Sequence, residues 1–174
     1  TQASCQTQAQ IDAAFTTWLG QVTSSGGCNS QLTNDNTGAP PACGGSKTVI
    51  FSVTSTCGVE ASCSAVFTVT AAPAVVLTCP ANKTEAECQT QAQIDAAFTS
   101  WLAEATNSGG CNAQLTNNNT GAPLACGGST IVTFTVTSSC EADVTCSAVF
   151  TVTAAPAVVL TCPVNKTEAS CQTQ

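Results

Sequence analysis

Two stretches of the chain carry apolar side chains at the three- and four-residue spacing of a helix face. The first contains Ile11, Phe15, Trp18, Leu19 and Val22, and the second contains Ile94, Phe98, Trp101, Leu102 and Ala105. Thr-x-x-Gln capping boxes at Thr7 and Thr90 precede them, and Gly-Gly pairs at 26–27 and 109–110 follow. The pattern predicts two amphipathic helices that end at the glycine pairs.

Strict alternation of apolar and polar positions predicts two strands after the second helix. Val132, Phe134 and Val136 alternate with Thr133, Thr135 and Thr137, and later Cys146, Ala148, Phe150 and Val152 alternate with Ser147, Thr151 and Thr153. The β-branched run 75–80, which ends in a proline, and residues 114–116 are predicted to be shorter strands. We expect an antiparallel sheet with one face in water.

The same pattern recurs with a period of 83 residues, which is the distance in sequence from Cys5 to Cys88. Cysteines follow the same period: Cys5, Cys28, Cys43, Cys57, Cys63 and Cys79 recur as Cys88, Cys111, Cys126, Cys140, Cys146 and Cys162, and Cys171 begins a third copy. Module boundaries at the Ala-Ala-Pro-Ala segments give a first module at 1–72 without its first strand, a complete module at 73–155 and the start of a third at 156–174. We therefore expect a piece of a longer tandem array.

Composition favours a disulfide-rich extracellular protein. The 174 residues include 13 cysteines, and modules this small bury only a marginal hydrophobic core. Cysteines at this density predict disulfides formed in an oxidising compartment. Because the net charge is −7 and only 7% of residues are charged, we expect no nucleic-acid partner. No apolar run approaches the roughly 20 residues that span a bilayer, so we expect no membrane insertion in this segment.

The sequence contains only weak candidates for a ligand-binding or metal-binding site. Trp18 and Trp101 lie on the apolar helix faces, which favours a core position over sugar stacking. The turn 34–38, Asn-Asp-Asn-Thr-Gly, is similar to the start of a calcium loop, but its copy at 117–121 has no carboxylate. Without histidine or a Cys-x2-Cys pair we expect no zinc, no other metal and no cofactor. Asn82, Asn118 and Asn165 begin glycosylation sequons.

Catalysis by acid–base chemistry needs titratable side chains that are held close to each other, and titratable side chains are sparse in this chain. Histidine, arginine and tyrosine do not occur, and the ten carboxylates are scattered singly. We expect no enzymatic activity and no catalytic residues.

Three motifs carry a resemblance to a known family. They are Thr-Cys-Pro at 78–80, Gly-Gly-Cys at 109–111, and the closing stretch from Gly127 that contains Cys140 and Cys146. Together they resemble the hyalin-repeat-like (HYR-like) modules, in the multi-cysteine form found in giant surface adhesins of gliding bacteria exported by type IX secretion. The resemblance implies tandem immunoglobulin-like β-sandwich modules, mainly β with one helix per repeat, and a cell-surface, adhesive setting.

The resemblance also implies a disulfide pairing within each module. Carried over, it pairs Cys79 with Cys146, Cys111 with Cys140, and Cys88 with Cys126. One period earlier it pairs Cys28 with Cys57 and Cys5 with Cys43, and it leaves Cys63, Cys162 and Cys171 to partners outside the chain. Tension entering at Cys79 would then leave through Cys146, so the residues between them would carry no load.

These observations favour a structural and adhesive role as a stiff, disulfide-linked stalk or extracellular filament of a large cell-surface adhesin. The expected partners are neighbouring modules of the same polypeptide, surface glycans, and like chains in a filament. Two alternatives stay open. One is a glycan-binding module that uses the polar Asn and Thr turns, and the other is an ice-binding array that uses the row Thr133, Thr135 and Thr137.

Overall fold

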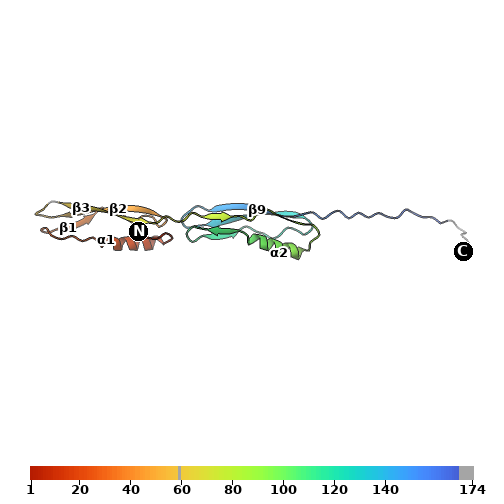
Figure 1. The fold of residues 1–174 in the computed structure, drawn as a ribbon, viewed down its shortest axis with the longest axis horizontal. Coiled ribbons are helices and arrows are strands. Elements are labelled where there is room, and N and C mark those ends of the chain that lie inside the picture. Colours follow the sequence, from red (N-terminus) through yellow and green to blue (C-terminus); the bar gives the residue numbers. More distant parts are fainter. Residues whose placement is uncertain (59, 169–174) are drawn as a thin grey trace.

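A computed structural model of the chain describes residues 1–58 and 60–168 and is mainly β, with two helices (Figure 1). The elements form two bodies in a row, followed by an extended segment after β9 (Figure 1). In chain order they are α1 (Gln8–Leu19), β1 (Gln31–Asn34), β2 (Gly45–Thr54), β3 (Ala61–Val69), β4 (Val76–Thr78), β5 (Lys83–Glu85), α2 (Gln91–Leu102), β6 (Thr106–Ser108), β7 (Gln114–Asn117), β8 (Gly128–Thr137) and β9 (Val144–Val152).

Both helices begin where their capping boxes predict. The Thr90 side chain accepts a hydrogen bond from the Gln93 amide, and the Gln93 side chain accepts one from the Thr90 amide at 2.9 Å; Thr7 and Gln10 do the same. The predicted ends at the glycine pairs are wrong, because α1 ends at Leu19 and α2 at Leu102. A turn at residues 103–104 follows α2, and residues 106–108 pair with β4, which a continued helix would prevent.

The predicted alternating strands are confirmed as β8 and β9, the centre of a sheet in the order β5-β9-β8-β7. They pair antiparallel from Gly128 opposite Val152 to Val136 opposite Val144. The predicted strand at 75–80 is β4, but it pairs with β6 and forms a separate two-stranded sheet. β5 joins the edge of the main sheet in parallel with β9.

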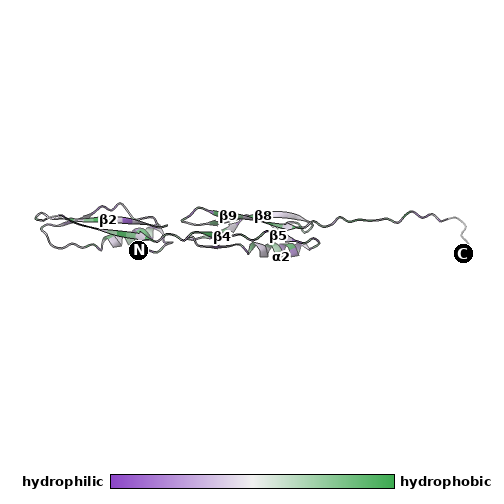
Figure 2. Cartoon of the chain, turned by 45° about the horizontal axis from the view of Figure 1, so that its top comes forward, coloured by the Kyte–Doolittle hydropathy of each residue, from purple (hydrophilic) through white to green (hydrophobic). Residues whose placement is uncertain are grey.

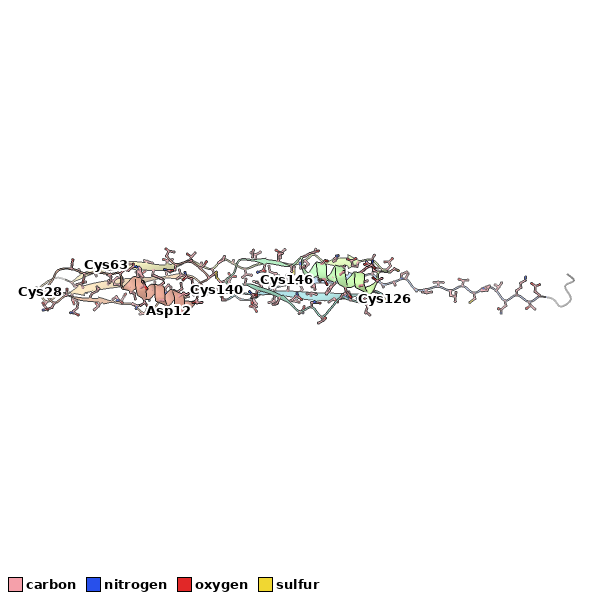
Figure 3. All side chains as sticks on the ribbon, turned by 90° about the horizontal axis from the view of Figure 1, so that it is seen from below. Asp12, Cys28, Cys63, Cys126, Cys140 and Cys146 are labelled. Carbon is pink, nitrogen blue, oxygen red and sulfur yellow. A yellow bond between two sulfur atoms is a disulfide. The ribbon has the colours of Figure 1, made fainter. Side chains whose placement is uncertain are left out.

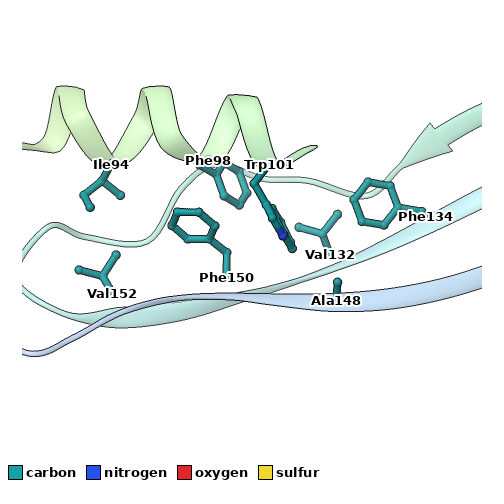
Figure 4. Packing of buried hydrophobic residues seen from close by; sticks show 8 residues of the cluster. All are labelled: Ile94, Phe98, Trp101, Val132, Phe134, Ala148, Phe150 and Val152. Atoms are coloured by element: carbon teal, nitrogen blue, oxygen red, sulfur yellow. The ribbon is translucent and has the colours of Figure 1, made fainter. Parts of the chain in front are cut away.

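The core of the second repeat lies between α2 and the inner face of this sheet (Figure 4). Val132, Phe134 and Val136 are fully buried, as their alternation predicts. Phe98 packs edge-on against Phe150, with ring centroids 5.2 Å apart. Trp101 is also fully buried, and its indole nitrogen donates a hydrogen bond to the Ala81 carbonyl at 2.7 Å. Hydrophobic and hydrophilic residues alternate along α2 (Figure 2).

The first repeat has the same helix and a three-stranded sheet, β1-β2-β3, with the same register one period earlier. Its core contains Ile11, Phe15, Val49, Phe51, Phe67 and Val69. Gln2 forms a parallel bridge with Val69, as Glu85 does with Val152 in β5. The positions that would correspond to β4 lie before Thr1 of the sequence. Neither α1 nor α2, the helices of the described residues, is long and apolar enough to cross a membrane.

Candidate functional site at the repeat junction

The connection between the two repeats is hydrogen-bonded to both of them. Ala72 donates its amide to the Cys43 carbonyl of the first repeat at 3.0 Å. On the other side, the Pro73 carbonyl accepts from the Gly110 amide at 2.8 Å, and the Val75 amide donates to the Glu141 carboxylate at 2.7 Å. These bonds use the backbone groups of the connection, so its path is defined on both sides.

Gly109 allows the connection to approach closely. Its φ is +71°, and a Cβ on it would lie 1.9 Å from the backbone oxygen of Ala74. No side chain fits there, because real Cβ contacts do not occur below 3.0 Å. The Gly-Gly pair that the sequence suggested as a helix stop therefore serves the junction between repeats.

Two disulfides cross this junction. Cys5 bonds to Cys111 and Cys43 bonds to Cys140, over sequence separations of 106 and 97 residues. Cys5 and Cys43 belong to the first repeat, and Cys111 and Cys140 to the second. Together with the peptide backbone, the bridges connect the repeats at three points, and Figure 3 places Cys140 at this junction.

A third disulfide lies inside the second repeat. It joins Cys79, directly after β4, to Cys146 in β9, with Cα atoms 6.1 Å apart. This is the pair that the resemblance implied. It ties the two-stranded β4-β6 sheet to the four-stranded sheet.

The other implied pairs do not occur. Cys111 and Cys140 lie near each other, since the Ser139 amide donates to the Cys111 carbonyl, but each bonds to the first repeat. The pairs Cys5–Cys43 and Cys111–Cys140 are therefore replaced by two bridges between repeats. Cys5 has φ +63°, a left-handed turn conformation that sets its direction at this end of the repeat.

The implied pairs Cys28–Cys57 and Cys88–Cys126 are not formed either, and these four cysteines are exposed thiols. Cys63 and Cys162 are also unbridged and exposed within the described part of the chain, whereas Cys171 lies outside the described residues. We call the six unbridged residues the open cysteines: Cys28, Cys57, Cys63, Cys88, Cys126 and Cys162. In Figure 3, Cys28 lies at the far end of the first repeat and Cys126 at the far end of the second.

Cys57 is the open cysteine whose surroundings favour the thiolate. A hydrogen bond from the Thr56 hydroxyl, 3.7 Å from the sulfur, and a second from Cys28 lower the pKa of Cys57 below its ordinary value of 9.0. Desolvation acts in the opposite direction but is the smaller effect. The thiolate is the form that attacks a disulfide, so this end of the first repeat favours thiol–disulfide exchange.

The turn at 34–38 uses its side chains to form the turn itself. Asn34 and Asn36 accept hydrogen bonds from the amides of Asn36 and Gly38, at 3.1 Å and 2.7 Å, and the Asp35 carboxylate accepts from the Ile50 amide at 2.8 Å. Asn118 replaces Asp35 in the second repeat and accepts from the Thr133 amide at the same distance. An amide and a carboxylate perform the same role, so this position shapes a turn.

No protein-family model matches the sequence, and comparison with curated proteins also finds no match. The interpretation of the site therefore depends on its geometry. Sequence reasoning missed the role of Cys5 and Cys43 as junction cysteines, because their recurrence one period later is equally consistent with bridges within a repeat and with bridges between repeats.

Proposed function

We propose that this chain is a structural repeat region that forms a stiff, disulfide-linked stalk or extracellular filament of a large, adhesive cell-surface protein. The observation that carries the proposal is the pair of bridges Cys5–Cys111 and Cys43–Cys140 across one junction. A purely enzymatic or ligand-binding repeat has no need for two covalent links to its neighbour. A load-bearing array does, because a link of this kind stops the junction from opening.

The covalent geometry supports stiffness. A single peptide connection lets two modules swing about its soft dihedral angles. Two further attachments, at Cys111 and Cys140, restrict rotation in directions that the backbone alone leaves free. The hydrogen bond from Gly110 to Pro73 fixes the connection itself. Bending the junction must therefore deform several bonded contacts together.

The proposed extracellular setting rests on the disulfides and on the resemblance to HYR-like modules. Disulfides persist outside the cell, and the HYR-like resemblance adds the surface of gliding bacteria and type IX secretion as the proposed location and route. We propose that each repeat is an immunoglobulin-type sandwich in which the helix and the two-stranded sheet cover the larger sheet. The partners are then neighbouring repeats and like chains.

Electron microscopy of a tandem array of several 83-residue repeats tests the proposal. We expect thin, straight, beaded rods under oxidising conditions and curved chains after reduction. A matched variant with serine at both Cys5 and Cys43 positions of every repeat should be curved without reduction, whereas serine at the Cys79 and Cys146 positions should leave the rods straight. Flexible oxidised chains would contradict the proposal. Specific signals of the oxidised rods on a glycan array would favour a binding module.

A further inference from the structure

The long strands of both repeats expose the sheet face that points away from the helix. In the second repeat Val132, Phe134 and Val136 are buried on the helix side, so the residues that alternate with them point outward. Figure 1 draws α1 and α2 on one side of the molecule and β2, β3 and β9 on the other. We call the outward positions the outer face: the even-numbered residues of 46–52 and 62–68, and the odd-numbered residues of 129–135 and 145–151.

The outer face carries no charge, although the chain has a net charge of −7. Every residue on it is serine, threonine, isoleucine or valine. The four long strands contain one charged residue, Lys47, which alternates in step with Val49 of the inner face. At the edge, the Asp35 carboxylate accepts a hydrogen bond from the Ile50 amide, and the neutral Asn118 replaces Asp35 in the second repeat. Two like chains, which repel each other elsewhere, can therefore approach through this face.

Differences between the repeats leave the outer face uncharged. Thr48 and Ile50 correspond to Ile131 and Thr133, so threonine and isoleucine exchange places on the face. The other two differences on it replace serine by threonine. Elsewhere the charge does change between the repeats, at positions 2, 4, 21, 35, 47 and 58 and their counterparts. The two faces therefore share a character over their whole area and not one fixed residue, which suits a broad contact better than a point site.

Hydroxyl groups in the middle of the outer face have partners on the same sheet. Thr133 Oγ1 and Ser147 Oγ lie 2.9 Å apart across β8 and β9. At the edge, the Thr116 hydroxyl donates to the Thr135 carbonyl at 3.4 Å. Covering a hydroxyl costs least when it keeps a hydrogen bond. Because Ile131 between them is 67% exposed, covering this face removes apolar surface from water and leaves these hydroxyls paired.

We propose that a second copy of this chain binds to the outer face side by side, sheet against sheet. The proposal rests on the filament function and names the surface that joins like chains. Facing sheets pack about 10 Å apart, with the side chains of both faces interdigitated. Since the helix covers the other side of each sheet, a copy offers one such face, and a contact of like with like ends at two copies. The assembly is a pair of filaments.

The area of the outer face fits a contact that extends over both repeats. β9 has nine residues, so at about 3.3 Å per residue it is about 30 Å long. Three strands about 4.8 Å apart are about 15 Å wide, so two faces in contact bury about 900 Å² per repeat. Specific interfaces bury about 1,200–2,000 Å², which one repeat does not reach and two repeats do, at about 1,800 Å². The junction bridges hold the repeats together, so contacts add along the array.

Isoleucine methyl groups test the contact directly. The chain has four isoleucines: Ile50 and Ile131 on the outer face, and Ile11 and Ile94 in the two cores, where both are 0% exposed. The open cysteines and Cys171 are replaced by serine, so that disulfides cannot join copies. In NMR spectra of a dilution series we expect the methyl signals of Ile50 and Ile131 to shift and those of Ile11 and Ile94 to stay. Four constant signals overturn the proposal.

Two lysine variants separate the outer face from the general effect of charge. Ile50→Lys with Ile131→Lys charges the face in both repeats and changes the net charge from −7 to −5, since −7 + 2 = −5. Ala13→Lys with Ala96→Lys makes the same change at exposed helix positions and is the control. In analytical ultracentrifugation we expect the face variant to raise the dissociation constant of the dimer at least about tenfold, because like charges meet across the contact. Equal dissociation constants overturn the proposal.

The core methyl groups also report whether a variant is folded. If the signals of Ile11 or Ile94 are lost in the isoleucine variant, Thr48→Lys with Thr133→Lys tests the same face in both repeats, with the same control and the same expected result. Retained dimers in a folded face variant overturn the proposal.

Disulfide mapping separates the contact between copies from the filament function. If the chain stays monomeric while Cys5–Cys111 and Cys43–Cys140 are present, the contact is wrong and the filament proposal stands. Paired chains without these bridges would contradict the filament proposal instead. A monomeric chain with thermal hysteresis that Ile50→Lys with Ile131→Lys removes would overturn the contact in favour of ice binding.

Discussion

Pulling on the two ends of the chain measures whether the junction bridges carry force. The shortest covalent path from Thr1 runs to Cys5, crosses to Cys111 and continues to Glu168, about 60 residue steps. At about 3.5 Å per step this limits the extension to about 210 Å, whereas the reduced chain, with nearly 170 steps, reaches about 580 Å. A second path of nearly equal length returns from Cys111 to Cys79 and crosses to Cys146, so the residues between Cys5 and Cys79 are outside the load path.

The double variant Cys5→Ser and Cys43→Ser gives an intermediate length. The shortest path then runs along the backbone to Cys79, crosses to Cys146 and continues to the end, about 100 steps, or about 350 Å. The matched control, Cys79→Ser with Cys146→Ser, also removes a disulfide but leaves the path through Cys5 unchanged, so we expect about 210 Å.

Force spectroscopy with handles at residues 1 and 168 checks these lengths without reductant. The open cysteines and Cys171 are replaced by serine, so that new bridges cannot shorten the path. An oxidised chain that extends to about 350 Å or beyond would refute the reasoning, because the junction bridges would then be absent from the load path. A control variant that lengthens would refute it as well.

Four further substitutions test the contacts of the core, the junction and the thiol. Trp101→Ala should lower the free energy of unfolding by about 3–5 kcal/mol, and Trp18→Ala by less because Trp18 is half-buried; chemical denaturation followed by circular dichroism compares them. Gly109→Ala should displace the connection between repeats, and hydrogen exchange should detect lost protection of the Gly110 amide. Thr56→Val should raise the pKa of Cys57, so alkylation of Cys57 by iodoacetamide below pH 9.0 should become slower.

Local structure was predictable from the sequence where it depends on residues that are close together in the chain. Capping boxes placed the helix starts, and the alternation through Phe134 placed β8 and its buried face. The helix ends were not predictable from Gly109, since the backbone path after α2 depends on pairing of β6 with β4, a contact distant in sequence. Secondary-structure propensity reflects residues that are neighbours in sequence, so it carries no information about a partner strand as distant as β4.

The disulfide pairing failed for a related reason. A pairing inside one module and a pairing between successive modules have the same cysteine positions once the repeat is exact, so the sequence cannot separate them by period alone. The resemblance implied Cys79–Cys146, and both of these partners lie in one repeat. Cys5–Cys111 depends on how the end of one repeat meets the start of the next, which only the three-dimensional junction defines.

Pairing between repeats gives the molecule a direction. The end that carries Cys5 and Cys43 differs from the end that carries Cys111 and Cys140, so each junction joins two unlike surfaces. Unlike surfaces that meet in a straight line do not close on themselves. Both sets of cysteines recur with the period, since Cys28 and Cys57 are the counterparts of Cys111 and Cys140, and Cys88 and Cys126 are the counterparts of Cys5 and Cys43. A tandem array joined by these bridges therefore extends in one direction, and electron micrographs of oxidised arrays should show open rods and no rings.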